Sequence, residues 1–324
     1  MRDMLKKCCI LYNEPLPGAL EDELDIFDQV GYVEEYLVKL GYEVYRKGIT
    51  DAFLTQIDDL VNEKPGFVFN LVEAIRNKGE LNYFVPALLN LYRVPYSGNP
   101  LEAIFNTTSK VIAGKTMTDA GIGHPAIYRP SGKHLLEQGK RYIVKPVWED
   151  GSLGITADSV FSCEPGFEEK LKDKDDNHWM IQEFIDGREY NMSVLAGRNG
   201  PEVLPPAEIV FRDFPDDMPR IVDFRAKWVM DAFEYENTVR EFPGSGLPPA
   251  FIEELMETAR KCWHLFGLKG YARVDARADK DGNIYVIEVN ANPCISPDGG
   301  FVAATRQAGY TFEEVLRRIL EDLN

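Results

Sequence analysis

Apolar runs and helix-like patterns alternate over the first hundred residues. Residues 7–12 form a short apolar run, which is typical of a buried strand, and strand patterns recur at 41–45 and 67–71. Between the first two, apolar side chains recur every three or four residues from Val30 to Leu40 and stop before Gly41, as in an amphipathic helix. This alternation predicts a parallel α/β sheet.

The rest of the chain shows a different pattern. A helical stretch near 80–92 leads into the turn-rich residues 95–100, which mark a first domain boundary. Strand patterns follow at 142–146 and 180–185, with a glycine-rich segment between them. The last third contains two strong amphipathic helix patterns, which cover residues 251–266 and 312–323.

Composition narrows the class of protein. The chain has 324 residues and 44% hydrophobic residues, which excludes a disordered chain and allows about two or three domains. A net charge of −17 argues against nucleic acid as a principal partner, since phosphate backbones need a basic surface, but a few local cations could still hold ATP. No apolar run approaches the roughly 20 residues of a membrane span. The first eleven residues predict a strand rather than a signal peptide.

Five cysteines without metal-ligand spacing predict free thiols in a reducing cytoplasm, and four scattered histidines disfavour a histidine-based zinc site.

The most informative stretch is a predicted hairpin. Strand patterns at 271–277 and 284–290 flank Asp281-Gly282, and Asp-Gly is a strong signal for a two-residue turn. With that turn, Asp275 lies opposite Glu288 and Arg273 lies opposite Asn290, all on one face. Like charges directly opposite destabilise a sheet, so a cation such as Mg²⁺ between the carboxylates is expected, with the Asn290 carbonyl as a further oxygen ligand.

The alternative to this metal site is a solvated sheet face whose charges only aid solubility. We expect Ile284 and Val286 on the same face, which is unlike a plain water-facing surface. The interpretation depends on register, because one extra residue in the turn would move the two carboxylates to opposite faces.

A phosphate site is expected in the middle segment. Lys145 ends a strand, and five residues later Asp150-Gly-Ser-Leu-Gly154 offers small residues, backbone N–H groups and the Ser152 hydroxyl to phosphate oxygens. A second candidate, Ala113-Gly-Lys-Thr116, resembles the end of a Walker motif. It lacks the first glycine, where Ser109 stands, and falls in a predicted helix, so we reject it.

Taken in order, these segments resemble the ATP-grasp superfamily, and most closely the D-alanine–D-alanine ligase family. The matching segments are Lys110, Val144-Lys-Pro146 with Gly151-Ser-Leu-Gly154, Ile181–Glu189, Phe224-Arg-Ala-Lys227, Arg273-Val-Asp275, Glu288-Val-Asn290 and Arg306–Gly309. The resemblance implies an ATP-grasp fold, α/β and α+β in class, with an N-terminal parallel α/β domain (the pre-ATP-grasp domain). The implied domains are 1–98, 99–187 and 188–324, with ATP between the second and third.

The resemblance also implies roles for these residues. Lys110, Lys145, Gly151 and Ser152 would hold phosphates, Gln182 and the Ile185 backbone would face adenine, and Glu189 would face the ribose. Lys227 would reach the γ-phosphate from a mobile lid at 213–245, which looks long and irregular. Asp275, Glu288 and Asn290 would bind Mg²⁺ or Mn²⁺. Arg273, Lys227 and Ser152 would act in catalysis.

The substrate side departs from the family pattern. The usual glutamate for the first substrate's ammonium is absent, and Asp25, Glu23 or Glu73 are its candidate replacements. Trp228 stands for the usual tyrosine of the lid, Cys294 follows the metal segment, and Gly299 takes the place of the serine that grips the second substrate. Because pocket contacts set specificity, we expect a carboxylate–amine ligase whose substrates are not two D-alanines.

Two alternatives remain. The chain could be a true D-alanine–D-alanine ligase with an unusual pocket, or a catalytically silent ATP-binding or interaction protein on the same fold. Small-molecule acids and amines are the expected partners, with neither nucleic acid nor membrane, and the resemblance implies a homodimer.

Overall fold

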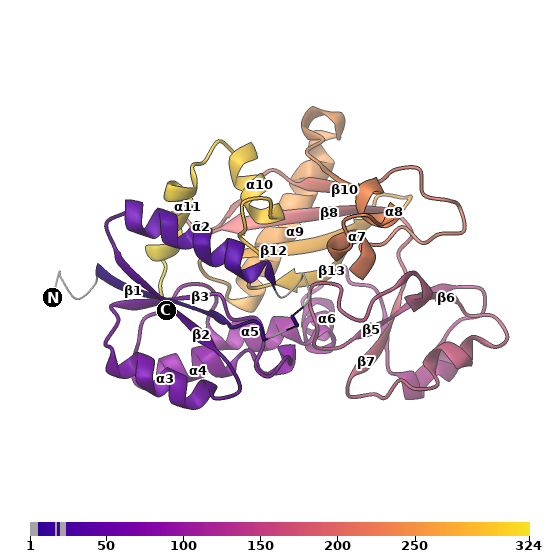
Figure 1. Ribbon diagram of the computed structural model, residues 1–324. Coiled ribbons are helices and arrows are strands. Elements are labelled where there is room, and N and C mark those ends of the chain that lie inside the picture. Colours follow the sequence, from indigo (N-terminus) through magenta and orange to yellow (C-terminus); the bar gives the residue numbers. More distant parts are fainter. Residues whose placement is uncertain (1–5, 17, 20–23) are drawn as a thin grey trace.

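The computed structural model describes residues 6–16, 18–19 and 24–324, and its strands form three β-sheets (Figure 1). The first sheet is parallel, in the order β2-β1-β3, as the alternating pattern predicts. Its strands are β1 (Lys7–Asn13), β2 (Glu43–Ile49) and β3 (Phe67–Asn70). The expected helix after β1 is α2 (Ile26–Lys39), which buries Val30, Val33 and Leu37. Helices α3 (Phe53–Asn62) and α4 (Phe84–Tyr92) complete this region, and α4 follows a short 3₁₀ turn at Gly79–Leu81.

The second sheet is antiparallel and has the order β4-β7-β5-β6. Its strands are β4 (Ile127–Tyr128), β5 (Arg141–Pro146), β6 (Val160–Ser162) and β7 (Trp179–Glu183). Helices α5 (Leu101–Thr108) and α6 (Lys110–Asp119) precede it. The rejected Walker-like segment 113–116 lies inside α6, as expected.

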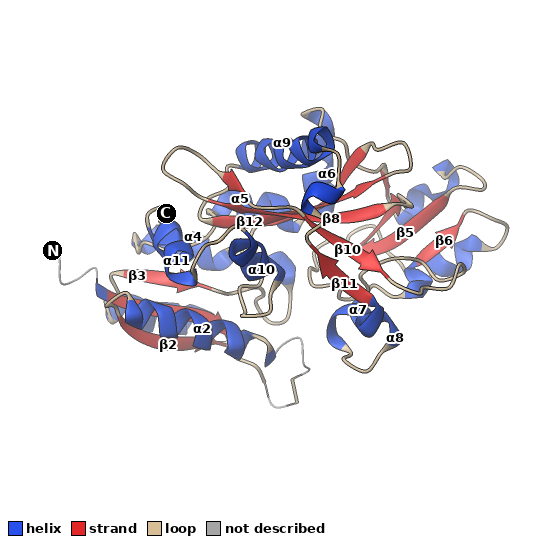
Figure 2. Ribbon diagram, turned by 90° about the horizontal axis from the view of Figure 1, so that it is seen from above, coloured by secondary structure: helices blue, strands red, loops and turns tan. Residues whose placement is uncertain are grey.

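The third sheet has six strands, in the order β11-β10-β8-β12-β13, with β9 paired to β8. The strands are β8 (Arg188–Leu195), β9 (Glu202–Val203), β10 (Ala207–Phe211), β11 (Thr238–Glu241), β12 (Tyr271–Ala278) and β13 (Ile284–Asn290). Helix α9 (Pro249–Phe266) packs on this sheet (Figure 2), because its buried stripe of Leu255, Ala259 and Cys262 belongs to the same hydrophobic core as Val274.

The two last helices return to the N-terminal sheet. Figure 1 shows α10 (Gly300–Gln307) and α11 (Phe312–Leu320) beside α2. The rings of Tyr32 and Phe312 stack there with centroids 4.3 Å apart. The residues of α11 share a core with the first strand, so the chain ends packed against its own beginning. No helix of the described residues is long and apolar enough to cross a membrane.

The hairpin of β12 and β13 has the predicted pairing at the site but a different turn. Asp279 pairs with Asn283, so the loop has three residues, and Gly282 takes a positive φ of 87°. The expected two-residue turn is therefore wrong. The register shifts between Asp275 and Ala276, and Ile287 is the extra residue of this bulge. The bulge restores Asp275 opposite Glu288 and Arg273 opposite Asn290.

The same bulge overturns a second expectation. Val286 pairs with Ala276 and is fully buried in the core with it, and Ile284 packs against that core. Ile284 and Val286 therefore lie on the core face, whereas the carboxylates lie on the other face of the sheet. The bulge is the physical cause, because an unpaired residue reverses the alternation of side chains along β13.

The predicted lid segment, residues 213–245, is more regular than expected. It contains α7 (Phe224–Trp228), α8 (Phe233–Asn237) and strand β11, which pairs with β10. Asp223 caps α7 by accepting a hydrogen bond from the Ala226 amide at 2.9 Å. The description of this segment as irregular is thus wrong over these stretches.

Candidate active site

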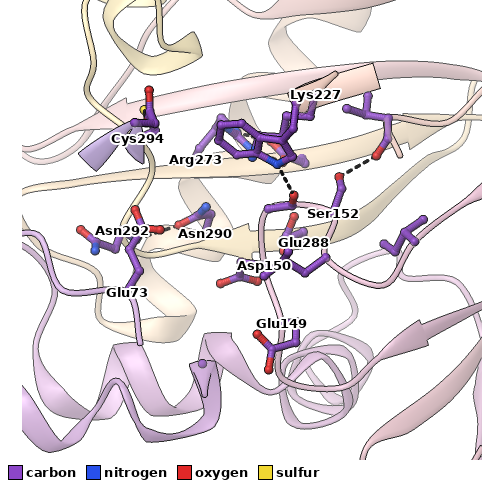
Figure 3. A pocket seen from close by; sticks show the side chains of 18 of the residues that line it. Glu73, Glu149, Asp150, Ser152, Lys227, Arg273, Glu288, Asn290, Asn292 and Cys294 are labelled. Atoms are coloured by element: carbon purple, nitrogen blue, oxygen red, sulfur yellow. Dashed lines mark hydrogen bonds and ion pairs between the residues drawn. The ribbon is translucent and has the colours of Figure 1, made fainter. Parts of the chain in front are cut away.

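One cavity of about 1180 Å³ is lined by residues from all three sheets (Figure 3). Every predicted site residue within the described part of the chain contributes to its wall, whereas Glu23 lies outside the described residues. These wall residues are Asp25, Glu73, Lys110, Lys145, Gly151, Ser152, Gln182, Ile185, Glu189, Lys227, Trp228, Arg273, Asp275, Glu288, Asn290, Cys294 and Gly299. Their shared location does not by itself assign a role to any of them.

The carboxylate pair of the hairpin is compensated by neighbouring cations. Arg273 donates two hydrogen bonds of 2.7 Å to Asp275, one to each carboxylate oxygen. Asn191 of β8 donates to Asp275 Oδ1 at 2.9 Å. Arg273 therefore neutralises the charge of Asp275.

Lys110 neutralises the second carboxylate of the hairpin. It begins α6, is nearly buried, and lies 3.1 Å from Glu288 Oε1 and 2.9 Å from Asp150 Oδ1. Burial lowers the pKa of Lys110, but the two carboxylates outweigh that effect and hold the pKa above its usual range. Burial conversely raises the pKa of Glu288, and Lys110 overcomes it and holds that pKa well below its usual range.

Asp150 is a third carboxylate of the site, for which no sequence pattern predicted a role. Figure 3 shows it beside Glu288. Burial raises the pKa of Asp150 to about 7, with a further contribution from Glu288 and against the lowering effect of Lys110. The position is visible in the sequence as the first residue of the glycine-rich loop, but its contact with Glu288 depends on the fold.

Lys145 differs from Lys110 because it has no carboxylate partner. Its side chain is nearly buried on β5, and no carboxylate of the described residues lies within ion-pair distance. Burial and the positive charge of Lys110 lower the pKa of Lys145 to about 8. A buried cation that lines a cavity without a counter-ion favours an anionic ligand.

The glycine-rich loop and the lid segment are in direct contact. Ser152, at a positive φ of 65°, donates its hydroxyl hydrogen to the Val222 carbonyl at 2.6 Å. The Trp228 indole donates to the Gly151 carbonyl at 2.9 Å. The Lys227 ammonium lies 3.8 Å from the position that a Cβ on Gly151 would take. The loop and the end of α7 thus form one wall of the cavity.

The predicted adenine and ribose residues contact an arginine that was not among the predicted site residues. Arg277 of β12 is buried and contacts Glu189 Oε2 through two nitrogens, at 2.9 and 3.1 Å. It also donates to the Ile185 carbonyl at 2.9 Å. Gln182 lies 3.3 Å from His124, whose pKa burial lowers to about 4, so that imidazole is neutral. The alternation Arg273-Asp275-Arg277 along one strand face is the signal that could have identified Arg277.

The far end of the cavity carries the predicted substrate residues. The Cys294 thiol lies 3.2 Å from Asp25 Oδ2 and 2.8 Å from the Ser296 hydroxyl. Burial, with the nearby Asp25 carboxylate, raises the pKa of Cys294 to about 12, so this thiol is not an activated nucleophile. Arg240 of β11, which was also not among the predicted site residues, lines the same end with Gly299 and Gly300.

Comparison with known proteins identifies the family. The family model described as "D-ala D-ala ligase C-terminus" matches residues 137–321, more than half of the chain. A D-alanine–D-alanine ligase of Haemophilus influenzae (strain PittEE) is 31% identical over 319 residues, which cover 94% of this chain and 99% of the relative. The chain belongs to the D-alanine–D-alanine ligase family. Its expected class, an ATP-grasp ligase that forms C–N bonds and releases ADP and phosphate, is thereby confirmed.

Solved structures confirm the predicted fold class. D-Alanyl-alanine synthetase A from Vibrio cholerae superposes with a TM-score of 0.76 at 16% identity, over 98% of both chains. The VanG D-Ala:D-Ser ligase from Enterococcus faecalis gives a TM-score of 0.72 at 17% identity, again over 98% of both chains. The domain boundaries at 98/99 and 187/188 stay predictions, although each of the three sheets lies on one side of each boundary.

Proposed function

We propose that this member of the D-alanine–D-alanine ligase family joins a carboxylic acid to an amine through an acyl-phosphate, and that its substrates are not two D-alanines. One observation supports the ligase proposal most directly. A single cavity is lined by four cations, Lys110, Lys145, Lys227 and Arg273, and by the carboxylate pair Asp275 and Glu288. Of these cations, Lys145 lacks a carboxylate partner among the described residues, which suits a polyanionic nucleotide.

The proposed reaction has two steps. A carboxylate oxygen of the first substrate attacks the γ-phosphorus of ATP, the bond to the β-phosphate oxygen breaks, and ADP leaves. The nitrogen of the amine then attacks the acyl carbon, inorganic phosphate leaves with the electron pair of its bond, and the nitrogen loses a proton to solvent. Lys110, Lys145 and Lys227 would draw negative charge from the phosphates, and Arg273 would stabilise the oxyanion of the tetrahedral intermediate.

The nucleotide would lie between the second and third sheets. Gly151 and Ser152 would hold phosphate oxygens, Gln182 and the Ile185 backbone would face adenine, and Glu189 would bind the ribose hydroxyls. The contact of the Trp228 indole with the Gly151 carbonyl supports exclusion of water, which would hydrolyse the acyl-phosphate, because it closes the lid segment over the glycine-rich loop.

A divalent cation fits the donor set of the hairpin. Asp275, Glu288 and the Asn290 carbonyl offer hard oxygens on adjacent strands, as Mg²⁺ or Mn²⁺ prefers. Within residues 6–16, 18–19 and 24–324, no group of three or more acidic, histidine or cysteine side chains is arranged to hold a metal, so phosphate oxygens would have to complete the coordination. Bound there, the cation would neutralise phosphate charge.

The proposal of altered substrates rests on the far end of the cavity. A Cβ on Gly299 would lie only 3.0 Å from the carbonyl oxygens of Cys294 and Ser296, so a serine at this position would be tightly packed against both carbonyls. The glutamate that the family usually places against the first substrate's ammonium is absent from its position in this sequence, and Asp25 is the proposed partner of a substrate ammonium. The VanG D-Ala:D-Ser ligase from Enterococcus faecalis, which has this fold, is named for a substrate pair other than two D-alanines.

The test is product identification. The purified protein is incubated with Mg-ATP and pairwise combinations of D- and L-amino acids, hydroxy acids and simple amines, while ADP release and product mass are followed. We expect ADP release with an amide product other than D-alanyl-D-alanine, and none from Arg273→Met. D-alanyl-D-alanine as the best product would contradict the proposed substrates. Nucleotide binding without ADP release in any combination would indicate a silent nucleotide-binding protein.

A further inference from the structure

His124 lies behind the proposed adenine site and has no part in the proposed reaction. Its Nε2 lies 3.3 Å from Nε2 of Gln182, a buried residue of β7 that lines the cavity. His124 is not itself among the residues of the cavity wall. The imidazole can therefore act on a bound nucleotide only through the Gln182 side chain.

The position of the imidazole is fixed by several elements of the fold. A Cβ on Gly114 of α6 would lie 2.6 Å from Cε1 and 2.9 Å from Nε2 of His124, so an alanine there would displace the ring. A glycine inside a helix is less stable than an alanine, and here it gives the ring its space. Backbone carbonyls close to His124 in sequence accept hydrogen bonds from the amides of Val286 on β13 and Glu183 on β7, at 2.8 and 2.9 Å.

The imidazole is neutral and offers an acceptor to Gln182. Burial and the positive charge of Lys145 lower the pKa of His124 to about 4. The ring also makes a hydrogen bond to the backbone of Pro125. Proline has no N–H, so its carbonyl accepts this bond and takes the single N–H of the neutral ring. The Nε2 atom, which faces Gln182, then carries a lone pair and accepts from the Gln182 amide nitrogen.

This contact sets the orientation of the Gln182 amide. With its nitrogen turned toward His124, the amide presents its oxygen on the other side, and no donor among the described residues contacts that oxygen. A purine beside Gln182 therefore meets an acceptor rather than a donor. The 6-amino group of adenine donates hydrogen bonds, whereas the 6-oxo group of guanine accepts them.

We propose that His124 orients the Gln182 amide so that its oxygen accepts a hydrogen bond from the 6-amino group of the purine, and thereby selects ATP over 6-oxopurine nucleotides. The inference rests on the proposed placement of adenine at Gln182. His124 contacts neither the nucleotide nor the reacting atoms, so it is a positioning residue. A 6-oxo group would face the amide oxygen, lose its hydrogen bond and be repelled.

The test compares ATP with inosine triphosphate, which has a 6-oxo group and lacks the 2-amino group of guanine. Calorimetry with Mg²⁺ and a non-hydrolysable analogue of each nucleotide measures both dissociation constants without turnover. We expect the wild-type protein to bind the ATP analogue at least about tenfold more tightly. In His124→Leu the amide is free to turn, so this preference should fall by about tenfold. Loss of a merely structural side chain would weaken both nucleotides alike and leave the ratio unchanged.

Two further variants test the orientation itself. His124→Gln offers a carbonyl oxygen close to the position of Nε2, so we expect it to retain most of the preference. Gly114→Ala pushes against the ring and should lower the preference although His124 is present. In the His124→Leu background, Gly114→Ala should have no additional effect on the ratio, because the two changes act through the same contact.

A control and the decisive outcomes complete the experiment. His264→Leu removes an exposed histidine from the last turn of α9, and we expect it to bind both nucleotides as wild type does. An unchanged ratio in His124→Leu overturns the proposal, as does a wild-type protein that binds the two analogues equally or binds neither. Intact preference for ATP without ADP release in any substrate combination instead contradicts the proposed ligase alone.

Discussion

Lys110 and Lys145 are both nearly buried, but their pKa values are shifted in opposite directions by their neighbouring side chains. The Lys110 ammonium is held between Asp150 and Glu288, whereas Lys145 has no such partner among the described residues and its pKa falls to about 8. A triphosphate beside Lys145 would favour the charged form, so its pKa rises on binding. Above pH 8, nucleotide binding must therefore take up a proton.

We expect nucleotide affinity to weaken as the pH rises above about 8, approaching tenfold per pH unit. Calorimetry of ATP-analogue binding at pH 9, in two buffers with different ionisation enthalpies, should record uptake of close to one proton. Lys145→Met should abolish the uptake, and Lys261→Met on the surface of α9 should retain it. Equal uptake in wild type and Lys145→Met would assign the proton to another group.

Arg277 and Glu189 form a buried pair, with side chains 4% and 9% exposed. We expect Arg277→Met to lower the free energy of unfolding by about 3–5 kcal/mol, because it leaves the Glu189 charge buried without a partner. Urea unfolding measures this loss. Arg212→Met, which breaks the exposed pair with Glu241, should cost about 0–1 kcal/mol. Similar losses for the two variants would show that Glu189 is solvated in spite of its burial.

Most single site residues could be predicted, whereas their partners could not. Lys145, Gly151 and Ser152 lie close together in the sequence, in a pattern of a strand followed by a glycine-rich loop that is typical of phosphate binding. Arg240 has no such pattern. The alternation along β12 places Arg277 on the cavity face, but it does not indicate the partner Glu189, because β12 and β8 pair across a long sequence distance. The pairing of Arg273 with Asp275 is equally invisible, since alternation places two side chains on one face without saying that they contact each other.

At the scale of elements, the contact between the glycine-rich loop and α7 joins two segments that form one wall of the cavity. Trp228→Phe keeps the ring and removes the hydrogen bond to the Gly151 carbonyl, a loss of about 1 kcal/mol. We expect KM for ATP to rise about fivefold and hydrogen exchange of residues 222–241 to accelerate. Trp263→Phe, in the core between α9 and the third sheet and outside the cavity, should change neither. Unchanged exchange in Trp228→Phe would place lid closure elsewhere.

The hairpin shows how far register can be inferred from residue types. The Asp-Gly signal located the turn correctly but not its length, because a glycine at positive φ suits both two-residue and three-residue loops. The bulge at Ile287 has no sequence signal, since isoleucine is an ordinary strand residue. The face of Glu288 was therefore predicted correctly, and the face of Val286 was not.

At the scale of the whole molecule, the chain closes on itself through its last helix. Phe312 of α11 contacts Tyr32 and Tyr36 of α2 and belongs to the core beneath the first sheet. Phe312→Ala should cost about 3–5 kcal/mol and accelerate hydrogen exchange in Ile26–Lys39. Leu135→Ala, at an exposed site, should stay within about 0.5 kcal/mol of wild type. Unchanged exchange in α2 would mean that the first sheet is stable without α11.

The sequence patterns did not predict that the last helix packs against α2. The amphipathic pattern of residues 312–323 predicted a helix with one buried face, and the structure confirms the helix as α11. The pattern carries no information on which sheet that face covers. Adjacent segments of a chain usually pack together, but α11 packs in the same core as α2, which is far away in the sequence.

The three-residue turn and the Ile287 bulge have a consequence for how such hairpins diverge. Each feature adds one residue to the hairpin, and their combined effect leaves Asp275 and Glu288 opposite each other. A relative that loses or gains a residue in the turn should therefore tolerate the change only with a compensating change in the strand. Insertions and deletions in this hairpin should therefore occur in pairs. A sequence alignment with a single gap in the hairpin would match Glu288 to the wrong residue of the relative.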